Sequence, residues 1–166
     1  KHTIEHYIEI VEKLKNKNSL IEFSSDFIIS YPGETDRDFQ ETLDIVKKIK
    51  FINSFSFIFS PRPGTKAAKL DLIDDKISKE RLIEIQKYLF SYQLNMNKSF
   101  EDKSIDVLIE NEMKGQNKLF GRNKYYNSVI LRGDKNNIGK TTKVKIKSCN
   151  QNTLFGEIEN NNMRAA

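Results

Sequence analysis

The sequence of 166 residues contains one cysteine, three prolines and no tryptophan. The single thiol, Cys149, cannot form an internal disulfide, and it cannot hold a metal ion or an iron–sulfur cluster alone. No apolar run approaches the roughly 18 residues that a membrane-spanning helix needs, and no leader of the secretory type opens the chain. These absences predict a cytoplasmic protein with no membrane partner, and they place any metal cluster outside this chain.

Positive charge is concentrated in the second part of the sequence. Residues 1–97 carry 15 Lys and Arg against 15 Asp and Glu, whereas residues 98–166 carry 13 against 8, which is the whole net charge of +5. Between Lys118 and Lys147 there are nine basic residues and one acid, Asp134. This patch favours a polyanionic partner. A solvated lysine surface is the alternative, and charge alone does not identify RNA.

Two segments of the first part are rich in β-branched and aromatic residues and predict strands, residues 20–31 and 52–60. The first ends at Pro32-Gly33, and the second ends at the sequence Pro-Arg-Pro-Gly of residues 61–64, which stops both helix and strand. We expect the side chains of the first strand to be mostly interior.

Three helices accompany these strands. Thr3 is placed to cap a helix that runs to about Asn16, Thr35 caps a second helix that ends near Lys50, and a third begins near Ser78. Apolar residues at helical spacing give the second and third helices one buried face each: Phe39, Leu43, Val46 and Ile49, then Leu82, Ile85, Leu89 and Tyr92. The order αβαβα predicts α/β architecture with parallel strands in a layer or barrel.

After about residue 97 the pattern changes to short alternating strands. Ile105, Val107 and Ile109 share one side of the first, and further strands are expected at residues 118–122, 127–132, 142–148 and 153–159. Five short strands predict a small β-barrel. In the fourth strand Val144, Ile146 and Ser148 point one way and three lysines point the other, a face that can contact phosphates: Lys143, Lys145 and Lys147.

Three motifs resemble those of radical-SAM methylthiotransferases. Residues 25–35, SDFIISYPGET, are similar to the fifth barrel strand of that family, where Gly usually stands in place of Ser30. Residues 59–65, FSPRPGT, resemble the tRNA-modifying branch, because the ribosomal-protein branch usually has non-basic residues after Ser-Pro. Residues 119–122, LFGR, with Asn127 and Val129, resemble the core of the TRAM domain.

The resemblance implies both the architecture and the activity of a parent enzyme. Residues 1–97 would be the C-terminal part of a radical-SAM partial TIM-type barrel, and residues 98–159 an OB-like TRAM barrel that binds RNA. Residues 160–166 are Asn-rich and without periodicity, a composition that predicts a disordered tail. The parent would convert isopentenylated adenosine beside the anticodon of tRNA to its 2-methylthio derivative, using S-adenosyl-L-methionine and [4Fe-4S] clusters. Because the cluster-binding cysteines are absent from this sequence, the chain is expected to be inactive alone.

The candidate site residues form two groups. By resemblance, the cofactor would lie at the C-terminal ends of the two strands, near Asp26, Ile28, Ser30 and Pro61. The residues expected to contact RNA are Lys118, Arg122, Lys124, Tyr125, Asn127, Lys143, Lys145 and Lys147, and Tyr126 is the alternative to Tyr125 for stacking on a base. For Arg122 and Asn127 the alternative is a brace within the barrel.

Four further residues could be taken for catalytic groups or metal ligands. We interpret Glu34 as a helix-start residue, His6 with His2 as a surface pair, and Cys149 as a packing residue. The sequence therefore predicts no catalytic residue and no metal ligand in this chain. The expected partner is the anticodon stem-loop of tRNA, bound by a monomer. A ribosomal-protein methylthiotransferase and a non-catalytic RNA-binding remnant remain the alternatives.

Overall fold

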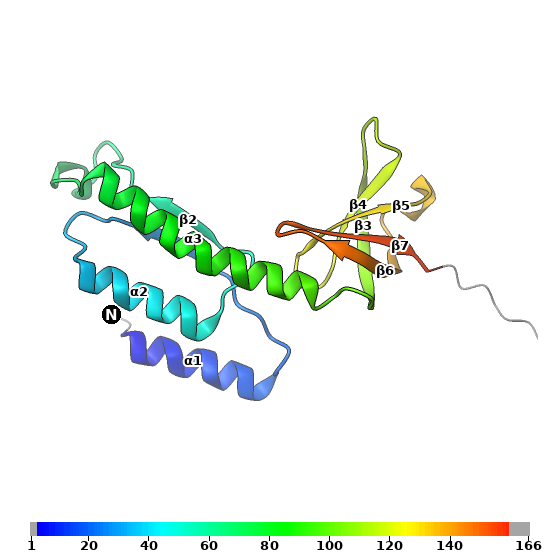
Figure 1. Cartoon of the computed structure of the whole chain (residues 1–166), viewed down its shortest axis with the longest axis horizontal. Coiled ribbons are helices and arrows are strands. Elements are labelled where there is room, and N and C mark those ends of the chain that lie inside the picture. Colours follow the sequence, from blue (N-terminus) through cyan, green and yellow to red (C-terminus); the bar gives the residue numbers. More distant parts are fainter. Residues whose placement is uncertain (1–2, 160–166) are drawn as a thin grey trace, which may run out of the picture. The chain divides into compact units, whose positions relative to one another are not determined.

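The computed structural model describes residues 3–159 (Figure 1). The chain divides into two compact units, residues 1–89 and residues 90–166, and the division falls inside the longest helix, α3 (Asp75–Lys98). The tail expected at residues 160–166 lies outside the described residues. No helix within residues 3–159 is both long and apolar enough to span a membrane.

The first unit has the predicted order of helices and strands. Its elements before α3 are α1 (Ile4–Lys17), β1 (Asp26–Ile29), α2 (Asp36–Ile49), β2 (Phe55–Ile58) and the short 3-10 helix η1 (Ala67–Lys69). β1 and β2 pair in parallel over their four residues, in the register Ile28 opposite Phe57. The parallel pairing that the alternation of helices and strands predicts is confirmed.

The first two helices begin at the predicted caps. The hydroxyl oxygen of Thr3 accepts a hydrogen bond from the N–H of His6 at 3.3 Å, at the start of α1. At α2 the Thr35 hydroxyl accepts from the N–H of Asp38 at 3.2 Å, and the Asp38 carboxylate accepts from the N–H of Thr35 at 2.8 Å. These bonds satisfy backbone donors that have no partner within the helix. The hydrogen bonds that the Thr35 N–H and hydroxyl donate to the Asp38 carboxylate lower the pKa of Asp38.

Helix α3 begins three residues before the predicted start at Ser78. The carboxylate of Asp74 accepts hydrogen bonds from the N–H groups of Lys76 and Ile77, at 2.9 and 3.2 Å, and so caps a turn that apolar periodicity could not reveal. The predicted face of α2 is correct, whereas on α3 two of the four predicted residues, Leu82 and Tyr92, are only half-buried. All four residues predicted for α2 are buried, as are Ile85 and Leu89 on α3.

The prediction that the first strand is mostly interior is wrong. Ile29 is 1% exposed, but its neighbour Ile28 is 64% exposed, because successive side chains of a strand point to opposite faces. Phe55 and Phe57 of β2 are also exposed, at 64% and 53%. In this chain only one face of the two-stranded sheet is packed into the unit.

The second unit is a closed five-stranded barrel. Its strands are β3 (Ser104–Met113), β4 (Lys118–Arg122), β5 (Ser128–Arg132), β6 (Thr141–Cys149) and β7 (Thr153–Ile158), with the 3-10 helix η2 (Lys135–Asn137) before β6. The order around the barrel is β3-β4-β5-β7-β6; β5 and β7 run parallel, and the other pairs are antiparallel. All five predicted strands are present, and closure leaves no unpaired edge.

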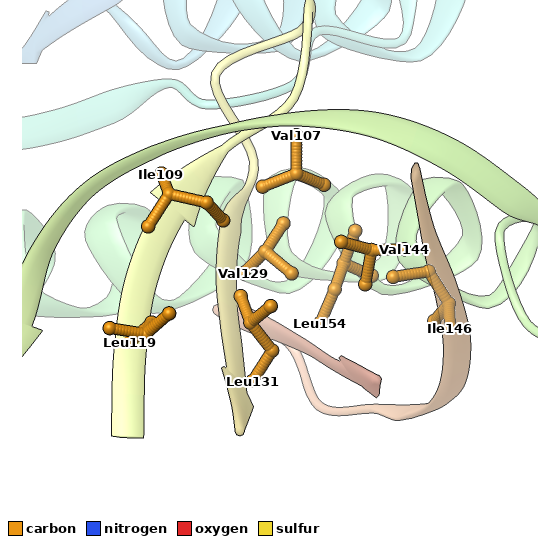
Figure 2. Close-up of a cluster of buried hydrophobic side chains, with 8 residues drawn as sticks. All are labelled: Val107, Ile109, Leu119, Val129, Leu131, Val144, Ile146 and Leu154. Carbon is orange, nitrogen blue, oxygen red and sulfur yellow. The ribbon is translucent and has the colours of Figure 1, made fainter. Parts of the chain in front are cut away.

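Alternating residues of the five strands fill the barrel, as Figure 2 shows. Val107 and Ile109 of β3 are fully buried, and Ile105 packs against the same cluster. The rest of the core is Leu119, Val129, Leu131, Val144, Ile146 and Leu154. The inward side that the period-two pattern predicts for β3 is therefore confirmed.

Candidate functional sites

The uncovered face of the β1–β2 sheet carries two of the four cofactor candidates. Asp26 is opposite Phe55 and Ile28 is opposite Phe57, so these four side chains share one face. The rings of Phe55 and Phe57 stack with centroids 6.3 Å apart. Parallel sheets are normally covered on both faces. An open face of this kind is a candidate surface for a ligand or for further protein.

The other two candidates follow the strand ends and differ in accessibility. Pro61 is exposed just after β2. Ser30 is 3% exposed, its N–H donates to the carboxylate of Glu34, and its buried hydroxyl has no hydrogen-bond partner. The Ser30 side chain is thus enclosed by the unit itself. A cofactor contact of Ser30 could therefore be made by its backbone and not by its side chain, and it stays a prediction.

Ser30 also has left-handed backbone, with φ of +56°. This conformation costs a side-chain-bearing residue about 1–2 kcal/mol and costs glycine almost nothing. The glycine that the resembling family has at this position therefore has a direct backbone explanation, one that the sequence alone did not supply.

Replacing Ser30 with glycine should stabilise the first unit by about 1 kcal/mol. Relief of the left-handed strain and loss of the unpaired hydroxyl outweigh the extra freedom that glycine gives the unfolded chain, about 0.4–1 kcal/mol. Denaturant unfolding followed by amide hydrogen exchange in α2 measures the change. The matched control is Ser24→Gly at an exposed residue outside the left-handed region, which should be neutral or destabilising. An equal effect of both changes would contradict the explanation.

Glu34 does not have the helix-start role that its position predicts. Asp38 completes the capping box of α2, and the Glu34 carboxylate instead accepts from the N–H of Ser30 and lies 3.3 Å from the guanidinium of Arg81. Arg81 also pairs with Asp36 at 2.7 Å, and its guanidinium lies 5.4 Å from the ring centre of Phe39. The side chains of Arg81 and Glu34 are 8% and 11% exposed. This buried ion pair joins the turn after β1 to α3.

His6 and Cys149 are the histidine and the cysteine of residues 3–159. Residues 3–159 contain no group of three or more His, Cys, Asp or Glu side chains that could hold a metal ion, and His2 lies outside the described residues. Burial, and then a hydrogen bond with Glu101, raises the pKa of the Cys149 thiol to about 11. The thiol packs against the barrel core and is protonated at neutral pH.

The three lysines of β6 leave the barrel core as predicted, but each has a partner within the chain. Lys143 pairs with Asp106 of β3 at 3.0 Å, Lys147 lies 3.7 Å from Glu157 of β7, and the ammonium of Lys145 donates to a backbone carbonyl. The two neighbouring strands supply these carboxylates, and Asp106 lies 37 residues from Lys143 in the sequence. The β6 lysines are consequently less available to phosphates than their number indicates.

Ser148 does not share the inward side of β6 with Val144 and Ile146. Ile146 pairs with Gly156 of β7, and Ser148 pairs with the adjacent residue Phe155. Two residues of β6 therefore lie opposite one residue of β7, which is a β-bulge. The bulge turns Ser148 outward, where it is exposed. The strict alternation predicted for this strand is wrong at that one residue.

A groove of about 570 Å³ on the barrel unit brings together four of the predicted RNA contacts. Arg122, Lys124, Tyr125 and Lys143 line it, although they come from β4, β6 and the loop between β4 and β5. Its other lining side chains are Phe100, Ser104, Ile105, Asp106, Leu108, Glu110, Asn123, Tyr126 and Thr141. Lys118, Lys145 and Lys147 do not line it. The groove therefore combines aromatic and apolar walls with charges of both signs.

The loop 123–127 forms one wall of this groove. The Asn123 side-chain oxygen accepts from the N–H groups of Tyr125 and Asn127, at 2.9 and 3.1 Å. The ring of Tyr125 packs on Phe100 with centroids 6.1 Å apart, and the ammonium of Lys124 lies 4.8 Å from the Tyr125 ring centre. Tyr126 is 77% exposed and has φ of +63°. Phe100 and Leu108 are site residues that the sequence does not predict, because nothing in its spacing places them beside this loop.

Asn127 is a brace rather than a surface contact. It is 3% exposed, and its side-chain amide donates to the side-chain oxygen of Asn97 at 2.7 Å. The Asn97 amide donates in turn to the carbonyls of Asn150 and Gln151, both at 2.9 Å. We revise the expected RNA contact of Asn127 to the alternative that the sequence left open. Arg122, whose guanidinium pairs with Glu110 at 2.7 Å, lines the groove and remains a candidate.

Comparison with known proteins identifies relatives of both units. Residues 98–158 match the TRAM domain. The chain is 57% identical over 158 residues to the tRNA-2-methylthio-N(6)-dimethylallyladenosine synthase of Pelagibacter ubique, a match that covers 95% of this chain and 35% of the relative.

Proteins of the same name from Wolbachia pipientis wMel and Rickettsia akari are 38% and 41% identical, over 94% and 95% of this chain and 36% of each relative. The chain thus spans about a third of the length of the curated relatives it matches. The resemblance that the three motifs indicate is confirmed. The chain is homologous to the C-terminal region of tRNA-2-methylthio-N(6)-dimethylallyladenosine synthases, and its residues 98–158 are a TRAM domain.

Proposed function

We propose that this chain is the tRNA-binding part of a radical-SAM methylthiotransferase. The whole enzyme would add a methylthio group to isopentenylated adenosine beside the anticodon. The observation that carries the proposal is the groove on the barrel unit, where two lysines, an arginine and two tyrosines converge on a TRAM domain. Single-stranded RNA is recognised by stacking on aromatic side chains and by cationic contacts to its phosphates. The groove offers both.

Residues 1–97, which comprise the first unit and the rest of α3 up to residue 97, are proposed as the last part of the radical-SAM barrel. Their parallel sheet has only two strands and one uncovered apolar face, so it fits a sheet that continues in the rest of a larger protein. Asp26, Ile28 and Pro61 are accessible and fit the cofactor side of such a barrel. They would bind and orient S-adenosyl-L-methionine, and Ser30 and Glu34 would hold the turn beside them.

The chemistry of the proposed reaction comes from the cofactors. Reductive cleavage of S-adenosyl-L-methionine at a [4Fe-4S] cluster supplies the radical, and ligands outside this chain would hold the clusters. The residues of this chain contribute binding and orientation only. On this view the chain by itself has no methylthiotransferase activity.

A tRNA substrate is favoured over a ribosomal protein. Arg62-Pro63 follows the pattern of the tRNA-modifying branch, and the relatives described above are named for a tRNA nucleoside. We accordingly propose a cytoplasmic monomer that binds the anticodon stem-loop. In cells lacking the gene, nucleoside analysis of tRNA should show isopentenyladenosine in place of its 2-methylthio derivative; an unchanged tRNA together with a modified ribosomal protein would reverse the choice.

Replacing Lys143, Lys145 and Lys147 together with glutamine should weaken tRNA binding and reduce its dependence on salt. Each phosphate contact to single-stranded nucleic acid contributes about 0.7 to the slope of log K against log salt, so three contacts contribute roughly 2. Because all three lysines have partners within the chain, we expect a reduction of about 1–2.

Fluorescence anisotropy with labelled tRNA over a series of salt concentrations measures this slope. The matched control removes the same charge from three exposed lysines of the first unit, Lys66, Lys69 and Lys76. A slope that is unchanged in the β6 variant would exclude this lysine face from the phosphate contacts.

A further inference from the structure

We propose that the groove on the barrel unit holds a single unpaired ribonucleotide, with its base on the ring of Tyr126 and its phosphate at Lys124. This inference deepens the proposed function, on which it rests, because it names the kind of RNA element that the barrel selects. The groove lies wholly within residues 100–143. Its volume of about 570 Å³ falls within the range of about 300–1,000 Å³ that is usual for small-molecule sites.

Tyr126 is the free aromatic surface of the groove. The ring of Tyr125 is occupied by Lys124 on one side and by Phe100 nearby, and it is only half-exposed. Tyr126 is 77% exposed although it carries a large apolar ring. Stacking of a base on such a ring would cover apolar surface that is now in water, and it is tolerant of base identity.

The Tyr126 ring is presented by a braced loop. Its N–H donates to the carbonyl of Asn123 at 3.0 Å, and the side chain of Asn123 fixes the residues on both sides of it. Buried Asn127 anchors the end of the loop to Asn97, which is 1% exposed. The left-handed backbone of Tyr126 is strained for a side-chain-bearing residue, and the bonds around it maintain this conformation without any ligand.

The charges of the groove favour one nucleotide over a run of phosphates. Arg122 and Lys143 are paired with Glu110 and Asp106, so the groove carries two carboxylates that would repel a continuous phosphate backbone. Lys124 has no ion-pair partner within residues 3–159 and can take one phosphate. The carboxylates can accept hydrogen bonds from a ribose 2′-hydroxyl, the group that distinguishes RNA from DNA.

The test uses the full chain and three labelled probes: an RNA stem-loop with an unpaired loop, a fully paired RNA with the same number of phosphates, and the DNA version of the stem-loop. We expect Tyr126→Ala to weaken binding of the RNA stem-loop by roughly 5- to 150-fold, the measured range for loss of one stacked base. Binding of the paired RNA should not change. The salt slope should also stay constant, because no charge is removed.

Companion variants separate stacking from charge and from folding. Tyr126→Phe should bind as the unaltered chain does, and Lys124→Gln should lower the salt slope by about 0.7. Tyr31→Ala, at a half-exposed tyrosine of the first unit, is the matched control. Because Tyr126 is exposed, its replacement should leave the thermal unfolding temperature unchanged.

Each outcome decides between the two proposals. If the unaltered chain binds none of the probes, the RNA-binding function itself is wrong. If it binds the RNA stem-loop, but Tyr126→Ala has no effect or weakens the paired RNA equally, only the nucleotide groove is wrong. DNA stem-loop binding as tight as that of the RNA would overturn the role of the carboxylates as acceptors from the 2′-hydroxyl.

Discussion

Replacing Arg81 with alanine should destabilise the first unit by about 3–5 kcal/mol, because it leaves the carboxylate of Glu34 buried without its cation. The same change removes the hydrogen bonds from Arg81 to the Glu34 carbonyl at 3.3 Å and to Asp36 at 2.7 Å. Native-state hydrogen exchange of the α2 amides reports the loss within this unit, independently of the barrel.

Two further variants test whether the buried charge is the cause. Arg37→Ala removes an exposed arginine whose side chain is 87% exposed and pairs with Glu41, and it should cost less than about 0.5 kcal/mol. Adding Glu34→Gln to Arg81→Met should recover much of the stability lost in Arg81→Met alone, since no uncompensated charge remains. If the double variant were no more stable than the single one, lost packing rather than the buried carboxylate would explain the effect.

Gly121→Ala should destabilise the barrel by about 3 kcal/mol. A Cβ atom at this position would lie 2.4 Å from the carbonyl oxygen of Leu108 and 2.8 Å from a methyl carbon of Val107. The oxygen belongs to the backbone of the paired strand β3, so it cannot move without breaking the ladder. Thermal unfolding followed by circular dichroism at a β-sheet wavelength, with hydrogen exchange of the β4 and β5 amides, measures the loss.

The control for this steric argument is Gly133→Ala. A Cβ atom there would meet the terminal methyl groups of Ile158 and Leu119, both at 2.9 Å, and these ends of flexible side chains can rotate away. We expect a loss of about 1 kcal/mol. Neither glycine has a positive φ, so backbone strain does not enter the comparison. Equal losses in the two variants would show that close approach to the β3 backbone is not what requires glycine at position 121.

The sequence predicts much of the fold because local signals there agree with tertiary packing. Thr3 and Thr35 cap helices whatever surrounds them, since a cap satisfies donors of its own helix. The alternation in residues 104–158 predicts five strands, and burial of Val107 and Ile109 follows from it. In these segments the local sequence pattern and the tertiary packing require the same helix caps and the same buried side chains.

The candidate sites are less predictable because their chemistry depends on partners distant in sequence. Lys143 has the sequence pattern of a free phosphate ligand until β3 brings Asp106 against it, 37 residues away. Asn127 is a plausible surface residue until Asn97 is known to lie beside it. The exposure of Ile28 could not be foreseen either, because it depends on what covers the sheet. For such residues only the three-dimensional neighbourhood decides between binding and bracing.

The hydrogen bonds of Asn97 limit which gene segment could transfer the barrel to another protein. The TRAM domain is recognised over residues 98–158, yet Asn97, one residue earlier, supplies the hydrogen bonds that tie the loop 123–127 and the turn at residues 150–151 together. A recombination event that transferred only the recognised segment would leave the buried side-chain amide of Asn127 without this partner. The smallest gene segment that can be transferred with these bonds intact therefore includes the last turn of α3. This segment is longer than the part of the chain that matches the TRAM domain.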